Sequence, residues 1–133
     1  MIEIEDLMIG DWIMVDGKPY KYYAPELDMD NSLSGGLWIV DPNGIHYYTG
    51  SEDAIPIPLT NEILEKNDFE YQEGKIGAYG VTTASYYKYE NSPNIFCDGN
   101  PFAVWFEDEV NIQYVHQLQH ILKMCHIEKN IIL

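Results

Sequence analysis

The strongest constraint on the fold of this chain is a turn signal near its amino-terminal end. The short apolar run Trp12–Val15 is followed by Asp16-Gly17 and then by the tyrosine-rich run Lys18–Tyr23. Asp-Gly favours a tight hairpin turn, because both central positions of that turn need a positive φ. The sequence therefore predicts an antiparallel hairpin over residues 12–23.

A second hairpin is predicted over residues 37–48. Leu37–Val40 and Ile45–Tyr48 have the composition of strands, and Asp41-Pro42-Asn43-Gly44 lies between them. Proline at the second position and glycine at the fourth fit a type I turn. The acidic stretch between the two hairpins, residues 25–36, ends in Ser-Gly-Gly, so we expect a loop there.

The middle of the chain predicts an extended segment and one short helix. Each proline in Ile55-Pro56-Ile57-Pro58-Leu59 disfavours helical backbone in the residue before it, so this segment should be extended. Thr60 can cap a helix that runs from Asn61 to about Asn67. Asp68 should end that helix, since aspartate tolerates a left-handed turn better than most residues.

The second half of the chain predicts more strands and then the clearest helix. Lys75–Val81, Ala84–Glu90 and Phe102–Phe106 have the composition of strands, and the last is apolar on both faces, as a central strand would be. Apolar residues recur at helical spacing from Gln113 to Cys125. Ile131–Leu133 is either a final strand or an apolar tail that docks.

These elements predict an α+β fold in which mainly antiparallel strands pack against a carboxy-terminal helix, with one short central helix. The chain of 133 residues is expected to form a single domain, 1–133, and its 46% hydrophobic content is enough for a core. The opening Ile9–Gly17, with its Gly10-Asp11 pair ahead of a strand, resembles the first hairpin of small SH3-like barrels. The resemblance implies such a barrel at the amino-terminal end.

The charge balance excludes two classes of function. Seven lysines, no arginine and 22 acidic residues give a formal net charge of −15. Proteins that bind nucleic acid need cations to displace the counterions on the phosphates, and they rely on arginine for many contacts. We therefore expect no direct nucleic-acid binding, and no attraction to an anionic membrane.

The cysteine content and the amino-terminal residues favour a reducing, cytoplasmic location. Cys97 and Cys125 are the only cysteines, which is too few for a disulfide framework. The acidic start Met1–Asp6 lacks the basic and apolar regions of a secretory signal. The longest apolar run, Phe102–Phe106, is far too short to cross a membrane.

Three segments resemble a group of small proteins from gut anaerobic bacteria and their mobile elements. They are Leu7–Val15, the Pro-Leu-Thr segment and helix of Ile57–Leu64, which leads to Phe69-Glu70, and the Val-His-Gln-Leu-Gln helix of Tyr114–Gln119. That group has no assigned activity, so the resemblance implies a bacterial protein and supplies no catalytic residues.

The chain departs from this group at the ends of its two helices. It has Asp68 where the group has glycine, which implies a strained turn after the short helix. It also has Ile127 where the group follows the last helix with glycine, so the resemblance does not predict the course of the final eight residues.

His116 and His120 are the candidate metal ligands. They are four residues apart on the predicted last helix and therefore share a face, as a two-histidine metal pair would. The zincin motif needs a glutamate directly after the first histidine, and Gln117 stands there instead. We therefore interpret the pair as ordinary exposed or hydrogen-bonding histidines, and expect no metal and no cofactor.

Other residue patterns do not amount to a catalytic signature. Asp28, Asp30 and Ser32 mimic the start of a calcium loop, but its required glycine and final acid are missing. Cys97 is followed by Asp98, which would raise the pKa of the thiol rather than activate it. The sequence therefore leans against an enzyme without excluding one.

The eleven tyrosines are the candidate interaction residues. Aromatic residues favour strands, which explains most of them. In a strand, however, two adjacent residues point to opposite faces, so each adjacent pair should place one ring outside. Exposed tyrosine is common in protein interfaces. The candidates are the members of the three adjacent pairs, Tyr22, Tyr23, Tyr47, Tyr48, Tyr86 and Tyr87.

Two hypotheses for function follow. The first is a non-enzymatic, acidic protein-interaction module whose partner is another protein with a basic surface, such as a nucleic-acid-binding protein whose site the acids would occupy. The second is a small ligand-binding protein or enzyme that uses a tyrosine-lined pocket with His46, His116 or His120 and a nearby carboxylate. The sequence does not predict the oligomeric state or the identity of the partner.

Overall fold

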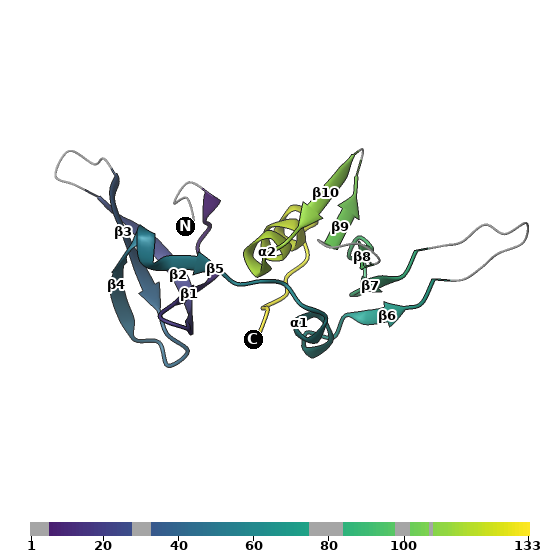
Figure 1. The fold of residues 1–133 in the computed structure, drawn as a ribbon, viewed down its shortest axis with the longest axis horizontal. Coiled ribbons are helices and arrows are strands. Elements are labelled where there is room, and N and C mark those ends of the chain that lie inside the picture. The colour runs from purple at the N-terminus through teal and green to yellow at the C-terminus, as the bar shows by residue number, and fades with distance from the viewer. Residues whose placement is uncertain (1–5, 28–32, 75–83, 98–101, 107) are drawn as a thin grey trace, which may run out of the picture. The chain divides into compact units, whose positions relative to one another are not determined.

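The structure, a computed structural model, describes residues 6–27, 33–74, 84–97, 102–106 and 108–133 (Figure 1). It contains two five-stranded antiparallel sheets and the two α-helices α1 and α2, which confirms the predicted α+β class. The chain divides into two compact units, Met1–Pro58 with Tyr114–His116, and Leu59–Gln113 with Gln117–Leu133. Compactness does not decide whether the units unfold together, so the single domain stays a prediction.

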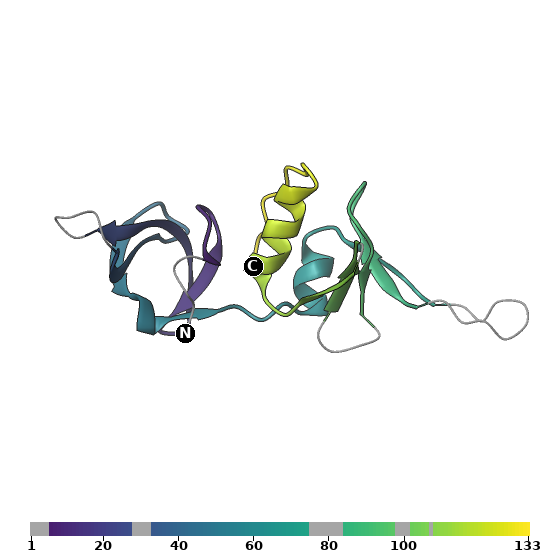
Figure 2. The same cartoon turned by 90° about the horizontal axis from the view of Figure 1, so that it is seen from above.

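The sheet of the first unit has the strand order β4-β3-β2-β1-β5. Its strands are β1 (Trp12–Val15), β2 (Lys18–Leu27), β3 (Leu33–Val40), β4 (His46–Gly50) and β5 (Ala54–Pro56), and a 3₁₀ turn at Ser51–Asp53 joins the last two. Figure 2 shows that this sheet is strongly curved. Among the described residues no ladder joins β4 to β5, so the curvature does not produce a closed barrel.

Both predicted hairpins are present in this sheet. Val15 of β1 faces Lys18 of β2 across the first turn, where Asp16 and Gly17 have φ values of 51° and 75°. These are the two positive φ values that the Asp-Gly signal predicts. In the second turn the Gly44 amide donates to the Asp41 carbonyl oxygen at 3.0 Å, as expected for a four-residue turn.

The prediction of a loop over residues 25–36 is wrong at both of its ends. Strand β2 continues to Leu27 and β3 begins at Leu33, while residues 28–32, with the calcium-like acids, lie outside the described residues. Pro25 is tolerated because one side of β2 has no described partner at that point. Strand β1 pairs with β2 only as far as Lys21, and the last described backbone hydrogen bonds on this side are made by Tyr22. Register shifts on either side of Pro25 mark the irregular pairing that the proline imposes.

The core of the first unit lies on one face of the sheet. Alternate residues of the strands supply it, together with Leu7 from the segment before β1. Burial of a large aliphatic side chain stabilises a fold by about 1.5–3 kcal/mol. The cluster consists of Leu7, Ile13, Val15, Tyr22, Leu37, Ile39 and Ala54.

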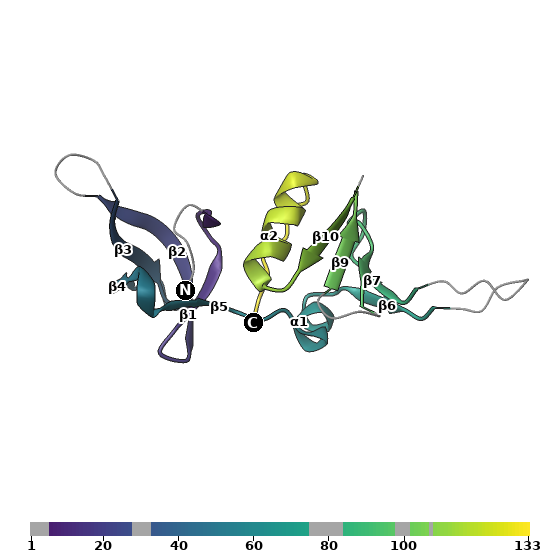
Figure 3. The same cartoon turned by 45° about the horizontal axis from the view of Figure 1, so that its top comes forward.

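The second unit contains both helices and a sheet with the order β10-β9-β8-β7-β6. Its elements are α1 (Asn61–Lys66), β6 (Glu70–Gln72), β7 (Tyr86–Lys88), β8 (Ile95–Phe96), β9 (Phe102–Trp105), β10 (Glu109–Ile112) and α2 (Val115–Met124), whose first two residues belong to the first unit. Helix α2 follows β10 after a short connection (Figure 3).

Most of the predicted elements of this unit are confirmed, with shorter bounds. The Thr60 hydroxyl accepts from the Ile63 amide at 3.2 Å and caps α1, as predicted. Strand β9 lies between two neighbours, as its apolar sequence indicates, although Trp105 at its end is exposed. The predicted strand Ala84–Glu90 is reduced to β7, and the predicted strand Lys75–Val81 lies outside the described residues.

Both helices end in the same motif. After α1 the Phe69 amide donates to the Leu64 carbonyl oxygen at 3.0 Å, and Asp68 between them has a φ of 67°. After α2 the Ile127 amide donates to the Leu122 carbonyl oxygen at 2.9 Å, and His126 has a φ of 57°. This pattern is the Schellman cap, whose left-handed residue is usually glycine. The strained turn expected at Asp68 is confirmed.

The final residues form a docked tail, the second of the two predicted alternatives. Ile131 is buried, and the side-chain amide of Asn67 bridges α1 to the backbone of the tail. Its Oδ1 accepts from the Ile132 amide at 2.7 Å, and its Nδ2 donates to the Ile132 carbonyl oxygen at 2.7 Å and to that of Ile63 at 2.8 Å. The Asn67 side chain thus makes the two hydrogen bonds with the Ile132 backbone that a neighbouring strand would make.

Candidate interaction surface

Two exposed aromatic rings face each other across β3 and β4. Trp38 and Tyr48 are directly opposite in the register, and their ring centroids are 5.5 Å apart with an interplanar angle of 60°. Trp38 is 40% exposed and Tyr48 52% exposed. Because the buried Leu37 and Ile39 flank Trp38 in the strand, alternation places this pair on the sheet face away from the core.

A second pair of rings lies on β2 and β4, the strands on either side of β3. The register of β2 and β3 shifts between Tyr22 and Ala24, and Tyr23 is the additional residue of this irregularity. Its ring is 5.1 Å from that of His46 in an edge-to-face arrangement, and both residues are exposed. We refer to Tyr23, Trp38, His46 and Tyr48 together as the aromatic surface.

Glycine at position 36 makes room for one of these rings. Gly36 lies diagonally across from Tyr48, and a Cβ atom built on Gly36 would lie 2.4 Å from the Tyr48 hydroxyl oxygen. The φ of Gly36 is not in the left-handed region, so the position needs glycine for the close approach of the ring rather than for an unusual backbone. The Tyr48 ring, which faces Trp38, is therefore packed against the backbone of β3.

A carboxylate borders the aromatic surface. Gly50 pairs with Gly36 and shares a strand face with Tyr48, since the two are two residues apart in β4. A Cβ atom built on Gly50 would lie 2.7 Å from Glu52 Oε1, so the Glu52 side chain folds back over that same face. A ligand on the aromatic surface would therefore meet a negative charge at the Gly50 end.

Lys21 of the first unit contacts an aromatic ring that is not part of the aromatic surface. The ammonium group of Lys21 lies 5.0 Å from the centroid of the Trp12 ring. Such cation–π contacts stabilise by about 0.5–1 kcal/mol at exposed sites. The sheet thus already contains one cation–π contact, the kind of contact that a cation from a ligand could make with an exposed ring.

Two of the six candidate tyrosines are buried and are removed from the predicted interaction surface. Tyr22 belongs to the core of the first unit, and Tyr87 is 3% exposed in the second. Burial and the charge of Asp11 raise the pKa of Tyr22. Burial, with the Glu65 carboxylate that accepts from the Tyr87 hydroxyl at 3.0 Å, raises the pKa of Tyr87 to about 12.

The other four candidates separate into different environments. Tyr23 and Tyr48 belong to the aromatic surface. Tyr47 is exposed but lies on the core face, where its ring is 5.8 Å from that of Tyr20. Tyr86 is half-buried and its ring is 6.0 Å from that of Phe96. The sequence thus predicted correctly that some tyrosine rings are exposed. Which of them share a face is determined by the strand register, which the sequence does not show.

The structure excludes the exposed alternative for His116, while the hydrogen-bonding alternative stays a prediction. His116 is buried, and its ring stacks on that of Tyr114 at 5.9 Å with an interplanar angle of 6°. His120 is half-buried one turn later. Within the described ranges, no group of three or more histidine, cysteine and acidic side chains is arranged to hold a metal ion.

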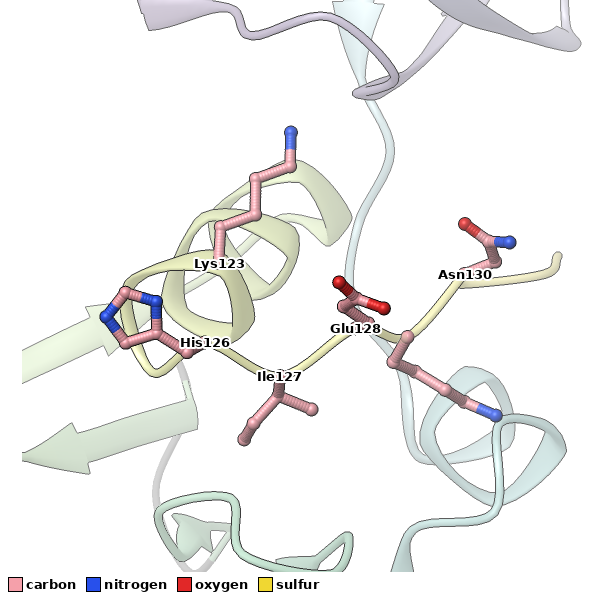
Figure 4. Close-up of a pocket in the computed structure, with 6 residues that line it drawn as sticks. Lys123, His126, Ile127, Glu128 and Asn130 are labelled. Carbon is pink, nitrogen blue, oxygen red and sulfur yellow. The ribbon is translucent and has the colours of Figure 1, made fainter.

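One hollow of the second unit lies between the end of α2 and the tail. It has a volume of about 670 Å³ and is lined by Lys123, His126, Ile127, Glu128, Lys129 and Asn130. Figure 4 shows that the polar ends of Lys123, His126 and Asn130 point in different directions and do not converge. Lys129 is engaged elsewhere, with Asp68 at 3.3 Å. Among the described residues, no hydrogen bond or ion pair joins His126 to Glu128, the acid of this lining.

Two members of the aromatic surface, Trp38 and His46, were not predicted to belong to it, although His46 was a candidate for the tyrosine-lined pocket. The signal was present: Trp38 lies between two aliphatic residues that alternate with it, and His46 lies two residues before Tyr48. What was missing was the register, which pairs Trp38 with Tyr48, and the irregularity of β2 at Tyr23, whose ring contacts His46.

Comparison with protein-family models, with curated proteins and with solved structures finds no match. In the part of the chain that the structure describes, no helix is both long enough and apolar enough to span a bilayer. Neither Cys97 nor Cys125 is in a disulfide.

Proposed function

We propose that the protein is a non-enzymatic, acidic interaction module whose aromatic surface binds a basic segment of another protein. The observation that carries the proposal is the gathering of exposed rings from three strands on one sheet face, next to the carboxylate of Glu52. Aromatic rings are enriched in protein interfaces, and their faces attract lysine and arginine side chains. The net charge of −15 would steer a cationic partner to the protein.

The size of the surface supports a weak or transient complex. A fully buried aromatic side chain contributes about 150–250 Å². Four rings that are about half exposed therefore offer roughly 300–500 Å², less than the about 800 Å² per partner of a stable interface. A short extended segment fits this area better than a second folded domain.

The strand order supports a further part of the proposal, an SH3-like architecture for the first unit. Strands β1 to β4 form a meander, and after the 3₁₀ turn at Ser51–Asp53 strand β5 returns to pair with β1. One more ladder, between β4 and β5, would close such a sheet into a small barrel. We also propose a reducing, cytoplasmic location, where Cys97 and Cys125 would remain thiols.

The proposal is tested with the variant Trp38→Ala. Tagged protein is used to capture partners from a lysate of its own organism at low and high salt, with Trp105→Ala as the matched control. Trp105 is also an exposed strand tryptophan, 57% exposed, but it belongs to the other unit. We expect a basic partner that Trp105→Ala retains, that Trp38→Ala loses, and that high salt releases from the wild type.

Two results would contradict this proposal. Equal capture by Trp38→Ala and the wild type would exclude the aromatic surface as the binding site. Binding that is insensitive to salt would exclude an electrostatic partner.

A further inference from the structure

The first unit has a small hollow beside the turns of its two hairpins. Its volume is about 290 Å³, and it is lined by Lys18, Pro19, Tyr20, Asp41, Pro42 and Tyr47. Sites for drug-sized ligands usually measure about 300–1,000 Å³. The hollow lies at the lower limit of this range, which favours a small ligand such as a single side chain.

Two perpendicular rings form one side of the hollow. Tyr47 faces the buried Ile39 in the register, and Tyr20 packs against the same core. Their centroids are 5.8 Å apart and their planes meet at 74°. Two planes at this angle cannot both lie flat on a planar guanidinium group, whereas a compact ammonium group can contact both.

The carboxylate of Asp41 is fixed in place by the turn. Its Oδ1 accepts from the backbone amides of Asn43 and Ile45, each at 2.9 Å. The backbone of Asp41 is also held, since its amide donates to the Ile45 carbonyl oxygen at 2.9 Å. A carboxylate that is already ordered loses little further freedom when it binds a cation.

Asp41 also acts on the neighbouring ring. Its negative charge is the main cause that raises the pKa of Tyr47, with burial and a side-chain hydrogen bond to the same carboxylate contributing. The tyrosine is therefore neutral at physiological pH, and Asp41 supplies the negative charge of the hollow.

We propose that this hollow binds the ammonium group of a lysine side chain from a partner protein, between the two tyrosine rings and the Asp41 carboxylate. The proposal rests on the proposed function only in taking the partner to be a basic protein. Aromatic walls with a nearby carboxylate are a recurrent arrangement for ammonium groups. Lys18 at the rim repels such a cation and keeps the affinity low.

The test uses Nα-acetyl-lysine amide as the probe, titrated into the ¹⁵N-labelled full chain and followed by amide NMR shifts. Nα-acetyl-norleucine amide, which has a similar apolar stem and no charge, is the control ligand. We expect millimolar binding of the lysine probe, with shifts centred on residues 20, 44 and 47. The norleucine probe should bind at least roughly fivefold more weakly, since it lacks the cation–π and carboxylate contacts.

Two variants change the charge of the hollow in opposite directions. Asp41→Asn keeps the oxygen that accepts from the turn amides, so the hairpin should be retained, and lysine binding should weaken roughly fivefold. Lys18→Gln should strengthen it by roughly twofold. Trp105→Ala should leave it unchanged, because Trp105 belongs to the other unit and is not among the residues that line the hollow.

Equal shifts with both probes, or no effect of Asp41→Asn in a folded protein, would overturn the assignment. These outcomes are separable from a failure of the proposed function. A protein that binds the lysine probe but captures no basic partner retains this site and loses the proposed function. A protein that captures a basic partner but does not bind the lysine probe retains the aromatic surface and loses this site.

Discussion

At the scale of single residues, the described non-glycine residues with a positive φ are Asp16, Asp68, Glu90 and His126, and two of them, Asp68 and His126, follow the helices. A side chain with a Cβ in this region costs about 1–2 kcal/mol relative to ordinary helical backbone. Asp68 is a residue type that tolerates this region, and its carboxylate lies 3.3 Å from the ammonium group of Lys129. His126 is exposed, and its position in the Schellman cap is one where glycine is preferred.

Replacing His126 with glycine should therefore stabilise the protein. The relieved strain exceeds the entropy that glycine adds to the unfolded chain, so we expect a gain of about 0.5–1 kcal/mol in the free energy of unfolding. Glu128→Gly, two residues later and without a positive φ, is the matched control and should destabilise. Urea denaturation measures both, and a loss of stability in His126→Gly would contradict the strain.

Tyr87 should make the stability depend on pH in the alkaline range. Its pKa is raised to about 12 in the folded protein from 10.0 in the unfolded chain, so between these values the folded state holds the proton more tightly. Stability from this group is complete below pH 10 and is lost as the pH rises towards 12, by up to about 2 kcal/mol.

The variant Tyr87→Phe isolates this effect. Its free energy of unfolding should be lower than that of the wild type at pH 8, because the hydrogen bond to Glu65 is lost. The difference between the two proteins should then shrink between pH 10 and pH 12. A difference that stays constant over this range would show that Tyr87 does not titrate with a raised pKa.

Residue types were easier to predict from the sequence than residue environments. Asp16-Gly17 and Thr60 act through local backbone chemistry, and both are confirmed. Tyr22 and Tyr23 are chemically identical neighbours, yet one is core and the other is surface. Which face is buried depends on partners distant in sequence, and period-2 alternation alone cannot supply them.

At the scale of elements, the tail and the end of α1 depend on one buried side chain. Asn67 is fully buried, and its amide serves both the helix and the tail. Asn67→Ala would remove three side-chain hydrogen bonds, two to the backbone of Ile132 and one to that of Ile63, and each contributes about 0.5–1.5 kcal/mol net. We expect a loss of about 2–4 kcal/mol in the free energy of unfolding.

The exposed Asn61, at the start of the same helix, gives the control variant Asn61→Ala, which should change stability by less than about 0.5 kcal/mol. Hydrogen exchange of the Ile132 amide is the more specific measurement. Its protection should fall in Asn67→Ala and not in Asn61→Ala, and unchanged protection would show that the tail docks by Ile131 alone.

The errors at this scale also have physical causes. The glycines and proline of residues 25–36 indicate a loop, but in this chain one glycine admits the Tyr48 ring and the proline lies where β2 has lost one neighbour. The helix at 113–125, by contrast, was predictable because its apolar stripe has a single interpretation. Leu118, Ile121 and Leu122 are all buried, as that stripe requires.

At the scale of the whole molecule, charge is the dominant property. A net charge of −15 opposes the compact state through self-repulsion, which salt screens. We therefore expect the melting temperature to rise by several degrees between about 20 mM and 500 mM sodium chloride. Calorimetry measures this, and it also shows whether the two units unfold in one transition, as a single domain requires. A melting temperature that falls with salt would mean that attractive ion pairs dominate.

The central claim is that the exposed rings of β2, β3 and β4 form the binding site of an acidic interaction module. The most direct test compares Trp38→Ala with Trp105→Ala in capture of partners at low and high salt. The account predicts a basic partner that Trp105→Ala and the wild type bind at low salt, that Trp38→Ala loses, and that high salt releases. Retention of that partner by Trp38→Ala would contradict it.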